Sequence, residues 1–175
     1  VDCLSALHRV MEDLEMYLHS NVAKKIKMLK EPEYEGETIT VEEEKLLLEQ
    51  AAKSKAVWLK ASIILAIDTG MRRGEIMKLK FEDVDFIKRT AKLRDTKGGV
   101  DRSVGLSNRS VEAIRELPRN IDGRVISCRD GDQFMWFWKQ CRKWSGVKKR
   151  FHSTRATFCT RAAESGWELL DIAAQ

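Results

Sequence analysis

Two arginines that lie far apart in the sequence carry the strongest indication of chemistry in this chain. Arg72 and Arg155 each come just after an expected helix start, and His152 lies three residues before the second. An arginine guanidinium offers paired hydrogen-bond donors in a fixed fork and stays charged at any working pH. Cleaving a phosphodiester without a metal needs such groups, because charge builds on the non-bridging oxygens in the transition state. These residue types therefore indicate a site for a phosphate.

The distribution of charge favours a polyanionic partner more than the formal net charge of +5 does. Residues 139–161 contain eight lysines and arginines and no Asp or Glu, whereas residues 31–49 contain eight glutamates and one lysine. Clustered cations of this kind contact backbone phosphates, and we expect the acidic segment to face away from nucleic acid. Five aromatic residues interleave with the basic run, and we expect most of them in the core: Trp136, Phe137, Trp138, Trp144 and Phe151.

The 175 residues are enough for one well-filled hydrophobic core with a small appendage. Residues 1–23 have the periodicity of an amphipathic helix, and residues 24–39 are polar, contain Pro32 and Gly36, and are predicted to be a linker. Residues 40–175 form the predicted main domain. No apolar stretch approaches the roughly 18 residues of a membrane span, and no secretory signal is visible, so we expect a cytoplasmic protein without a membrane partner.

Hydrophobic periodicity and turn signals predict a mainly α domain with a small three-stranded antiparallel β-sheet, an α+β arrangement. A capping-box pattern at Thr40 and Glu43 opens the first helix, and Gly98-Gly99 supplies a turn before the third strand. The predicted helices cover about 40–52, 57–68, 72–79, 109–117, 133–144 and 153–164. The predicted strands cover 84–87, 90–94 and 102–106.

Three segments resemble conserved boxes of the tyrosine recombinase (phage integrase) family. TGMRRGEI at residues 69–76 is similar to the first arginine box, T-G-x-R-x-x-E-[IL], and HSTRATF at residues 152–158 is similar to the second, H-x-[LT]-R-x-[ST]-F. TKGG at residues 96–99, followed by Arg102 and Val104, is similar to the lysine segment T-K-x-x-x-x-R-x-V-P-L. Each box alone is weak evidence, but the ordered trio is fairly specific.

The resemblance implies the catalytic-domain architecture of this family and its chemistry, which is site-specific DNA recombination or integration through a 3′-phosphotyrosyl intermediate. Arg72 and Arg155 would clamp the scissile phosphate, and His152 would donate a further hydrogen bond or help to manage the proton of the nucleophile. Lys97 would protonate the departing 5′-oxygen as a general acid. Glu75, one helical turn beyond Arg72, would orient that arginine. No cofactor and no metal are implied.

The resemblance also implies the partners. These are double-stranded DNA at attachment or recombination sites, a tetramer of the chain on that DNA, and accessory DNA-bending proteins, in a bacterial host. Contacts to the DNA backbone are assigned to Arg73, Lys143, Lys148, Lys149 and Arg150.

The chain departs from the family pattern at the nucleophile. The tyrosines are Tyr17 and Tyr34, far upstream of where the family keeps its catalytic tyrosine. We therefore expect that the nucleophile and the third box lie beyond Gln175, and that residues 1–23 are the last helix of a preceding DNA-binding domain. Gly105 replaces the proline of the lysine segment, and Thr154 the usual leucine of the second box.

Each candidate also has a plain structural interpretation. Arg72 and Arg73 could be solvated cations at a helix start, and His152 a structural histidine. Lys97 could be an exposed hairpin tip and Glu75 a helix-surface acid. A second function therefore stays open beside the enzyme, namely a DNA-binding relative without catalysis.

The four cysteines are spread widely and contain no CxxC pair. We interpret them as reduced core residues. The alternative, a zinc site, would combine Cys128, Cys141, Cys159 and His152.

Overall fold

The computed structural model of the chain describes residues 10–11, 37–94, 101–168 and 171–172. The chain divides into two compact units, Val1–Glu35 and Gly36–Gln175. In the first unit only Val10 and Met11 are described, and both are helical. The predicted helix 1–23 and most of the predicted linker 24–39 lie outside the described residues, so the proposed domain division stays a prediction.

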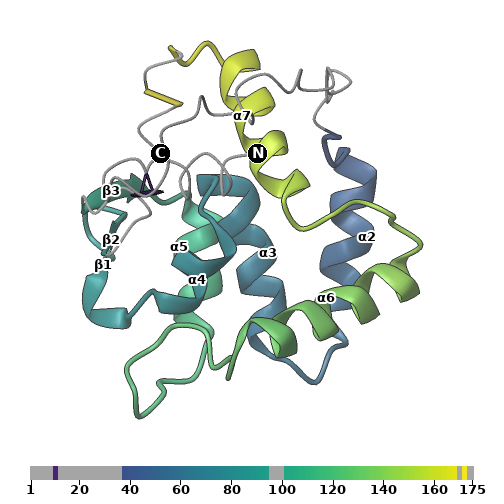
Figure 1. Cartoon of the computed structure of the whole chain (residues 1–175), viewed down its shortest axis with the longest axis horizontal. Coiled ribbons are helices and arrows are strands. Elements are labelled where there is room, and N and C mark those ends of the chain that lie inside the picture. The colour runs from purple at the N-terminus through teal and green to yellow at the C-terminus, as the bar shows by residue number, and fades with distance from the viewer. Residues whose placement is uncertain (1–9, 12–36, 95–100, 169–170, 173–175) are drawn as a thin grey trace. The chain divides into compact units, whose positions relative to one another are not determined.

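The described part of the second unit consists of six α-helices, one short 3-10 helix and three strands (Figure 1). In chain order they are α2 (Val41–Ala52), α3 (Trp58–Thr69), α4 (Arg73–Lys78), η2 (Phe81–Asp83), β1 (Val84–Asp85), β2 (Thr90–Leu93), β3 (Arg102–Gly105), α5 (Asn108–Arg115), α6 (Gly131–Ser145) and α7 (Ser153–Glu164). The predicted fold class, mainly α with a small three-stranded antiparallel sheet, is confirmed. Predicted and observed bounds differ by no more than two residues at either end. None of the helices in the described ranges is long and apolar enough to cross a lipid bilayer.

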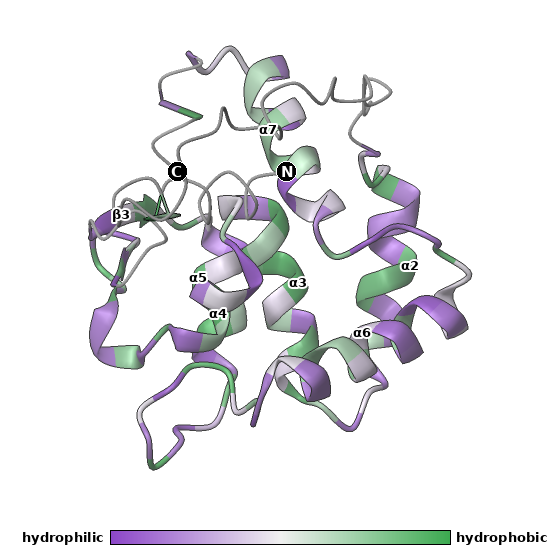
Figure 2. Cartoon of the chain, in the orientation of Figure 1, coloured by the Kyte–Doolittle hydropathy of each residue, from purple (hydrophilic) through white to green (hydrophobic). Residues whose placement is uncertain are grey.

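Helix α3 is the centre of the core. Ten of its twelve residues are buried, and the exceptions are Lys60 and Asp68, so nearly the whole surface of the helix is enclosed. It contacts α2, α4, α5 and α7, and Figure 2 shows its hydrophobic residues enclosed by helices whose outer faces are hydrophilic. The buried hydroxyls of Ser62 and Thr69 donate to the carbonyls of Trp58 (2.9 Å) and Leu65 (2.6 Å), so α3 buries them without leaving a donor unpaired.

The three strands form an antiparallel sheet in the order β1-β2-β3. Val84 is opposite Ala91, and Ala91 is opposite Val104. All three side chains are buried, so this face of the sheet belongs to the core. The predicted turn at Gly98-Gly99 lies outside the described residues.

Strand β1 is shorter than the predicted range 84–87. The Asp85 carboxylate accepts hydrogen bonds from the backbone N–H groups of Ile87 (3.0 Å) and Lys88 (2.8 Å), which turns the chain before a longer strand can form. Arg89 completes the turn with a φ of 53°, in the left-handed region.

The expectation that most aromatic residues of the basic run lie in the core is only partly right. Trp138 and Phe151 are buried and Phe137 is half-buried, but Trp136 and Trp144 are 56% and 68% exposed. Helix α6 turns a single stripe inward, which consists of Phe134, Trp138 and Cys141. Trp136 follows Phe134 by two positions and so lies on the side of the helix opposite this stripe, and Trp144 lies in the last turn of α6, after the final buried residue of the stripe.

Helices α3 and α7 meet closely at Gly70, the residue that ends α3. Gly70 has a φ of 65°, and a Cβ atom built on it would lie 2.5 Å from Cδ1 of Phe158 in α7. The backbone conformation and the Phe158 ring therefore both require glycine here. This contact places the end of α3 beside the first turns of α7.

Helix α2 begins at the predicted capping box and buries a glutamate next to it. The Thr40 hydroxyl accepts from the Glu43 N–H (3.2 Å), and the Glu43 carboxylate accepts from the Thr40 N–H (3.0 Å). Glu44 is 5% exposed and pairs with Arg109 of α5 (2.7 Å) and Arg161 of α7 (2.5 Å). One carboxylate thus joins three helices.

We expect Gly70→Ala to destabilise the fold by about 2–4 kcal/mol, because the alanine Cβ would meet both a left-handed φ and the Phe158 ring. Urea unfolding measures the loss. Gly74→Ala in α4 is the matched control: a Cβ there meets nothing within 4 Å, so stability should be unchanged or slightly higher. Equal free energies of unfolding for the two variants would show that the close approach of α3 and α7 at Gly70 does not affect stability.

We expect Glu44→Gln to destabilise the fold by about 1–3 kcal/mol, because it leaves Arg109 and Arg161 without their shared carboxylate. Both guanidiniums are partly exposed, which lowers the loss below that of a fully buried pair. Glu49→Gln, an exposed site on the same helix, serves as the control in thermal or urea unfolding. A similar effect of both variants would contradict a structural role for the Glu44 pairs.

Candidate active site

The junction between α3 and α4 is built to present Arg72. The Thr69 hydroxyl, while donating to the carbonyl of Leu65, accepts a hydrogen bond from the Met71 N–H (3.2 Å). Gly70 then reverses the chain, and Arg72 follows as the extended N-cap of α4. The Thr-Gly pair of the first box thus has a local reason: it stops one helix and starts the next within three residues.

Glu75 holds Arg72 through its backbone and its side chain. One carboxylate oxygen accepts from the Arg72 backbone N–H (2.7 Å), and the other accepts from Nη1 of Arg72 (3.0 Å). The Arg72 side chain is 47% exposed, whereas that of Glu75 is 8% exposed. The carboxylate therefore fixes the base of an arginine whose side chain stays accessible. Sequence reasoning expected Glu75 to orient Arg72, and the two are in contact.

Arg102 of β3 is a third member of this group. Its Nη1 and Nη2 donate to the two oxygens of Glu75 (3.0 and 3.1 Å), which is a bidentate pair. Burial raises the pKa of Glu75, but hydrogen bonds from the Arg72 N–H and from the Arg102 and Arg72 guanidiniums outweigh it and hold that pKa below its ordinary value. Sequence reasoning gave Arg102 no role, because nothing local in a strand sequence shows which buried acid it meets across the fold.

The second box forms the first turns of α7. Ser153, Thr154 and Thr157 are buried. The Thr154 hydroxyl donates to the Phe151 carbonyl (2.7 Å), and the Thr157 hydroxyl to the Ser153 carbonyl (2.8 Å). The hydroxyls of Thr154 and Thr157 are therefore buried with hydrogen-bond partners on the preceding turn, whereas the Ser153 hydroxyl is buried without one among the described residues.

The two catalytic residues proposed in this box remain accessible. His152, the N-cap of α7, is exposed. Arg155 is half-buried, and its Nη1 donates to the carbonyl of Gly70 (2.5 Å). The residue that ends α3 therefore also holds the arginine of the second box.

One surface cavity of about 490 Å³ brings the candidate residues together. It is lined by Met71, Arg72, Arg73, Gly74, Met135, Trp138, Arg142, Arg150, Phe151, His152, Thr154 and Arg155. Five arginines and a histidine thus surround it, and these described lining residues include no carboxylate. An enclosure of this composition suits an anion.

The electrostatics of Arg155 reflect this convergence of like charges. Burial and, after it, repulsion from Arg72 and Arg102 lower the pKa of the Arg155 guanidinium from its ordinary value. A bound anion would relieve that repulsion. The cavity therefore favours a ligand with at least one negative charge, such as a phosphodiester.

The remaining predicted residues differ in their relation to the cavity. Arg73 and Arg150 line it, whereas Lys143, Lys148 and Lys149 do not. Lys143 lies over the exposed ring of Trp144, 5.7 Å from its centroid. Lys97 lies outside the described residues, so its relation to the cavity stays a prediction.

Arg142 is a lining residue that sequence reasoning did not assign to the site. Its guanidinium donates to the carbonyls of Val147 (3.4 Å) and Lys148. It thereby ties the loop that carries Lys148, Lys149 and Arg150 to helix α6. Its membership in the basic run was the available signal, but its partners are backbone atoms that no sequence pattern identifies.

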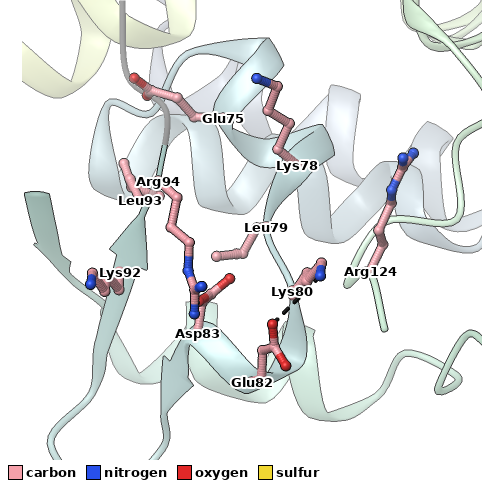
Figure 3. Close-up of a pocket in the computed structure, with 10 residues that line it drawn as sticks. All are labelled: Glu75, Lys78, Leu79, Lys80, Glu82, Asp83, Lys92, Leu93, Arg94 and Arg124. Atoms are coloured by element: carbon pink, nitrogen blue, oxygen red, sulfur yellow. Dashed lines mark hydrogen bonds and ion pairs between the residues drawn. The ribbon is translucent and has the colours of Figure 1, made fainter. Parts of the chain in front are cut away.

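A second cavity, of about 250 Å³, lies between α4, η2 and β2 and has a different character (Figure 3). Three carboxylates line it beside five cations, and two of those cations pair with lining acids: Arg94 with Asp83 (2.6 Å), and Lys80 with Glu82 (3.5 Å). Figure 3 shows these two pairs below Glu75, whose carboxylate lies apart from them. Because these carboxylates offset part of its positive charge, this cavity is a weaker anion site than the arginine-rich cavity lined by residues of α4, α6 and α7.

Comparison with known proteins gives one consistent family. A sequence model of the phage integrase family matches residues 37–175. The shufflon-specific DNA recombinase of Escherichia coli is 36% identical over 74 residues, which are 42% of this chain and 19% of that protein. The tyrosine recombinase XerA of Pyrococcus furiosus is 26% identical over 181 residues, which cover 95% of this chain and 63% of that protein. The chain thus spans less than two thirds of the curated relatives it matches.

Solved structures agree on the fold. The crystal structure of XerA recombinase superposes with a TM-score of 0.70 at 22% identity, covering 98% of this chain and 64% of that one. A lambda integrase tetramer bound to a Holliday junction gives a TM-score of 0.74 at 17% identity, covering 98% and 55%. The family match includes every residue that lines the arginine-rich cavity, and this chain belongs to the phage integrase family.

Proposed function

We propose that this chain is the catalytic domain of a tyrosine-type site-specific DNA recombinase, which cuts and rejoins DNA by transesterification. The observation that carries the proposal is the cavity where the first and second boxes meet. Arg72, His152 and Arg155 converge there, and no described lining residue is an acid. Such preorganised donors stabilise charge that develops on a phosphate.

In the proposed reaction, Arg72 and Arg155 donate to the non-bridging oxygens of the scissile phosphate. A tyrosine oxygen attacks phosphorus, the bond to the 5′-oxygen breaks, and a 3′-phosphotyrosyl linkage forms. Lys97 supplies a proton to the 5′-oxygen, and His152 either donates to the phosphate or takes part in removing the tyrosine proton. The linkage conserves the energy of the broken bond, so a second DNA end can reverse the step.

The nucleophile must come from outside these 175 residues. Tyr17 and Tyr34 do not match the family's tyrosine position, and both lie upstream of the catalytic domain. The tyrosine then belongs either to another part of the same polypeptide or to a partner subunit.

The DNA partner follows from the cations around the cavity. Arg73 and Arg150 at the cavity, with Lys148 and Lys149 on the loop beside Arg150, would contact phosphates next to the scissile one. Lys143 would extend this surface along α6. Among structures of the same fold, the Tn1549 transposon integrase is bound to circular intermediate DNA, and lambda integrase forms a tetramer on a Holliday junction. We propose double-stranded DNA and a tetramer on it for this chain as well, in the cytoplasm of a bacterial host, with accessory DNA-bending proteins as further partners.

A second candidate is a DNA-binding relative that keeps the phosphate clamp without cleaving DNA. Both functions require salt-sensitive DNA binding. They differ in whether a complete protein supplies a tyrosine to the cavity.

We expect the 175-residue chain to bind duplex DNA with an affinity that falls steeply as salt rises, and to form no covalent adduct. The assay uses a nicked suicide substrate, on which a cleaving recombinase becomes trapped, followed by denaturing electrophoresis. An adduct would contradict the assignment of the nucleophile to a tyrosine outside the chain. Absence of DNA binding at low salt would contradict both candidate functions.

We expect Arg72→Ala and Arg155→Ala each to lower DNA cleavage by the full-length recombinase at least about 100-fold, because each removes a donor to the transition-state charge. The measurement is the rate of adduct formation on the suicide substrate, with unfolding curves to verify the fold. Lys60→Ala, which removes an exposed cation of α3 outside the cavity, is the control and should cleave normally. Near-normal cleavage by either arginine variant would refute the clamp.

A further inference from the structure

The Glu75 carboxylate is saturated with hydrogen bonds, and two of them come from a strand rather than from its own helix. Each oxygen accepts one bond from Arg72 and one from Arg102. The Glu75 side chain is 8% exposed and that of Arg102 is 21% exposed. A pair this enclosed and bidentate is more restrictive than an exposed ion pair, because both planar groups are fixed in one plane.

We propose that Arg102 is a positioning residue, which holds Glu75 from strand β3 and thereby fixes Arg72 at the arginine-rich cavity. Arg102 does not line that cavity, so its action passes through Glu75. The inference rests on the proposed function only in taking the cavity as the phosphate site.

The Arg102–Glu75 pair first restrains the position of the Arg72 side chain. Arg72 has an exposed side chain, and without a fixed carboxylate its guanidinium would sample many rotamers. Glu75 can restrain it only if Glu75 is itself restrained, and helix α4 is only six residues long. Arg102 supplies that restraint from the sheet, two residues after the segment 95–100 that contains Lys97.

The Arg102–Glu75 pair also affects the positive charge that Arg72 presents to an anion. Paired with Arg72 alone, Glu75 would cancel the positive charge that is needed at a phosphate. With Arg102 the three residues carry a net charge of +1, so Arg72 keeps more of its attraction for an anion. The positive charge of Arg102 also acts on Arg155, because Arg102 is among the charges that lower the pKa of the Arg155 guanidinium.

The test compares Arg102→Gln with Arg94→Gln in the 175-residue chain. Arg94 is the matched control: it flanks the same segment, and its partner Asp83 is 5% exposed, but that partner does not contact Arg72. Arg94 directly follows β2 and Arg102 begins β3, so each variant removes one positive charge at this end of the sheet. Binding of inorganic phosphate is followed by NMR through the side-chain Nε–H of Arg155, and unfolding curves verify that each variant is folded.

We expect Arg102→Gln to weaken phosphate binding about five- to tenfold relative to Arg94→Gln. Arg102→Lys, which keeps the charge but not the fork, should recover less than half of that loss on a logarithmic scale. The pKa of the Glu75 carboxyl, measured in the same samples, should rise in Arg102→Gln and stay unchanged in Arg94→Gln.

Equal phosphate affinity in the two glutamine variants would overturn the proposal, and so would full recovery by lysine, which would reduce Arg102 to a distant charge. Wild-type protein that binds no phosphate at this cavity would overturn it as well. Failure of the proposed function is a separate result: the chain then binds phosphate as expected, with the Arg102 effect intact, yet shows no affinity for duplex DNA.

Discussion

The structure depends on holding two guanidiniums close to each other before any anion is present. Arg72 and Arg155 repel one another, and this repulsion adds to the effect of burial in lowering the pKa of Arg155. Each is restrained by a different group: a buried carboxylate holds Arg72, and the carbonyl of Gly70 holds Arg155. Because these partners are fixed by the fold, the cavity does not have to reorganise when a charged ligand enters, which is the condition for strong electrostatic stabilisation.

Gly70 is where local and long-range requirements coincide. It ends α3 in a left-handed conformation, admits the Phe158 ring, and offers its carbonyl to Arg155. Gly70 and Arg155 are 85 residues apart in the sequence, yet the two boxes touch through this glycine and its neighbours. Helix α3 makes this possible, since ten of its twelve residues are buried and its C-terminal end is therefore held at a fixed place in the core.

Most of the fold could be predicted from the sequence because its signals are local. The capping box at Thr40, the glycine after α3, and the hydrophobic periodicity of the helices each act within a few residues, and the predicted elements follow them closely. Strand β1 was predicted too long because the Asp85 turn competes with strand pairing. Trp136 and Trp144 were misjudged because an aromatic side chain on a helix is buried only if its own face meets the core.

The site was predictable only in part. The residues within the sequence boxes could be identified, whereas contacts between residues far apart in the sequence could not. The ordered boxes indicated that Arg72, His152 and Arg155 belong together, and they line one cavity. The second partner of Glu75, the backbone contacts of Arg142 and the buried pairs of Glu44 were not predicted. Each joins residues from different elements, and a single sequence contains no signal for such pairing.

The unequal restraint of the two arginines also has a consequence for how they would share a phosphate. Arg72 shares a carboxylate with Arg102, so part of its charge is offset, and its side chain is nearly half exposed to water. Arg155 is held by a neutral carbonyl and is partly desolvated, so its charge is less compensated. An ionic hydrogen bond gains strength as the surrounding dielectric falls. In the proposed reaction Arg155 would therefore stabilise the developing charge more strongly, whereas Arg72, fixed on two sides, would mainly set the orientation of the phosphate.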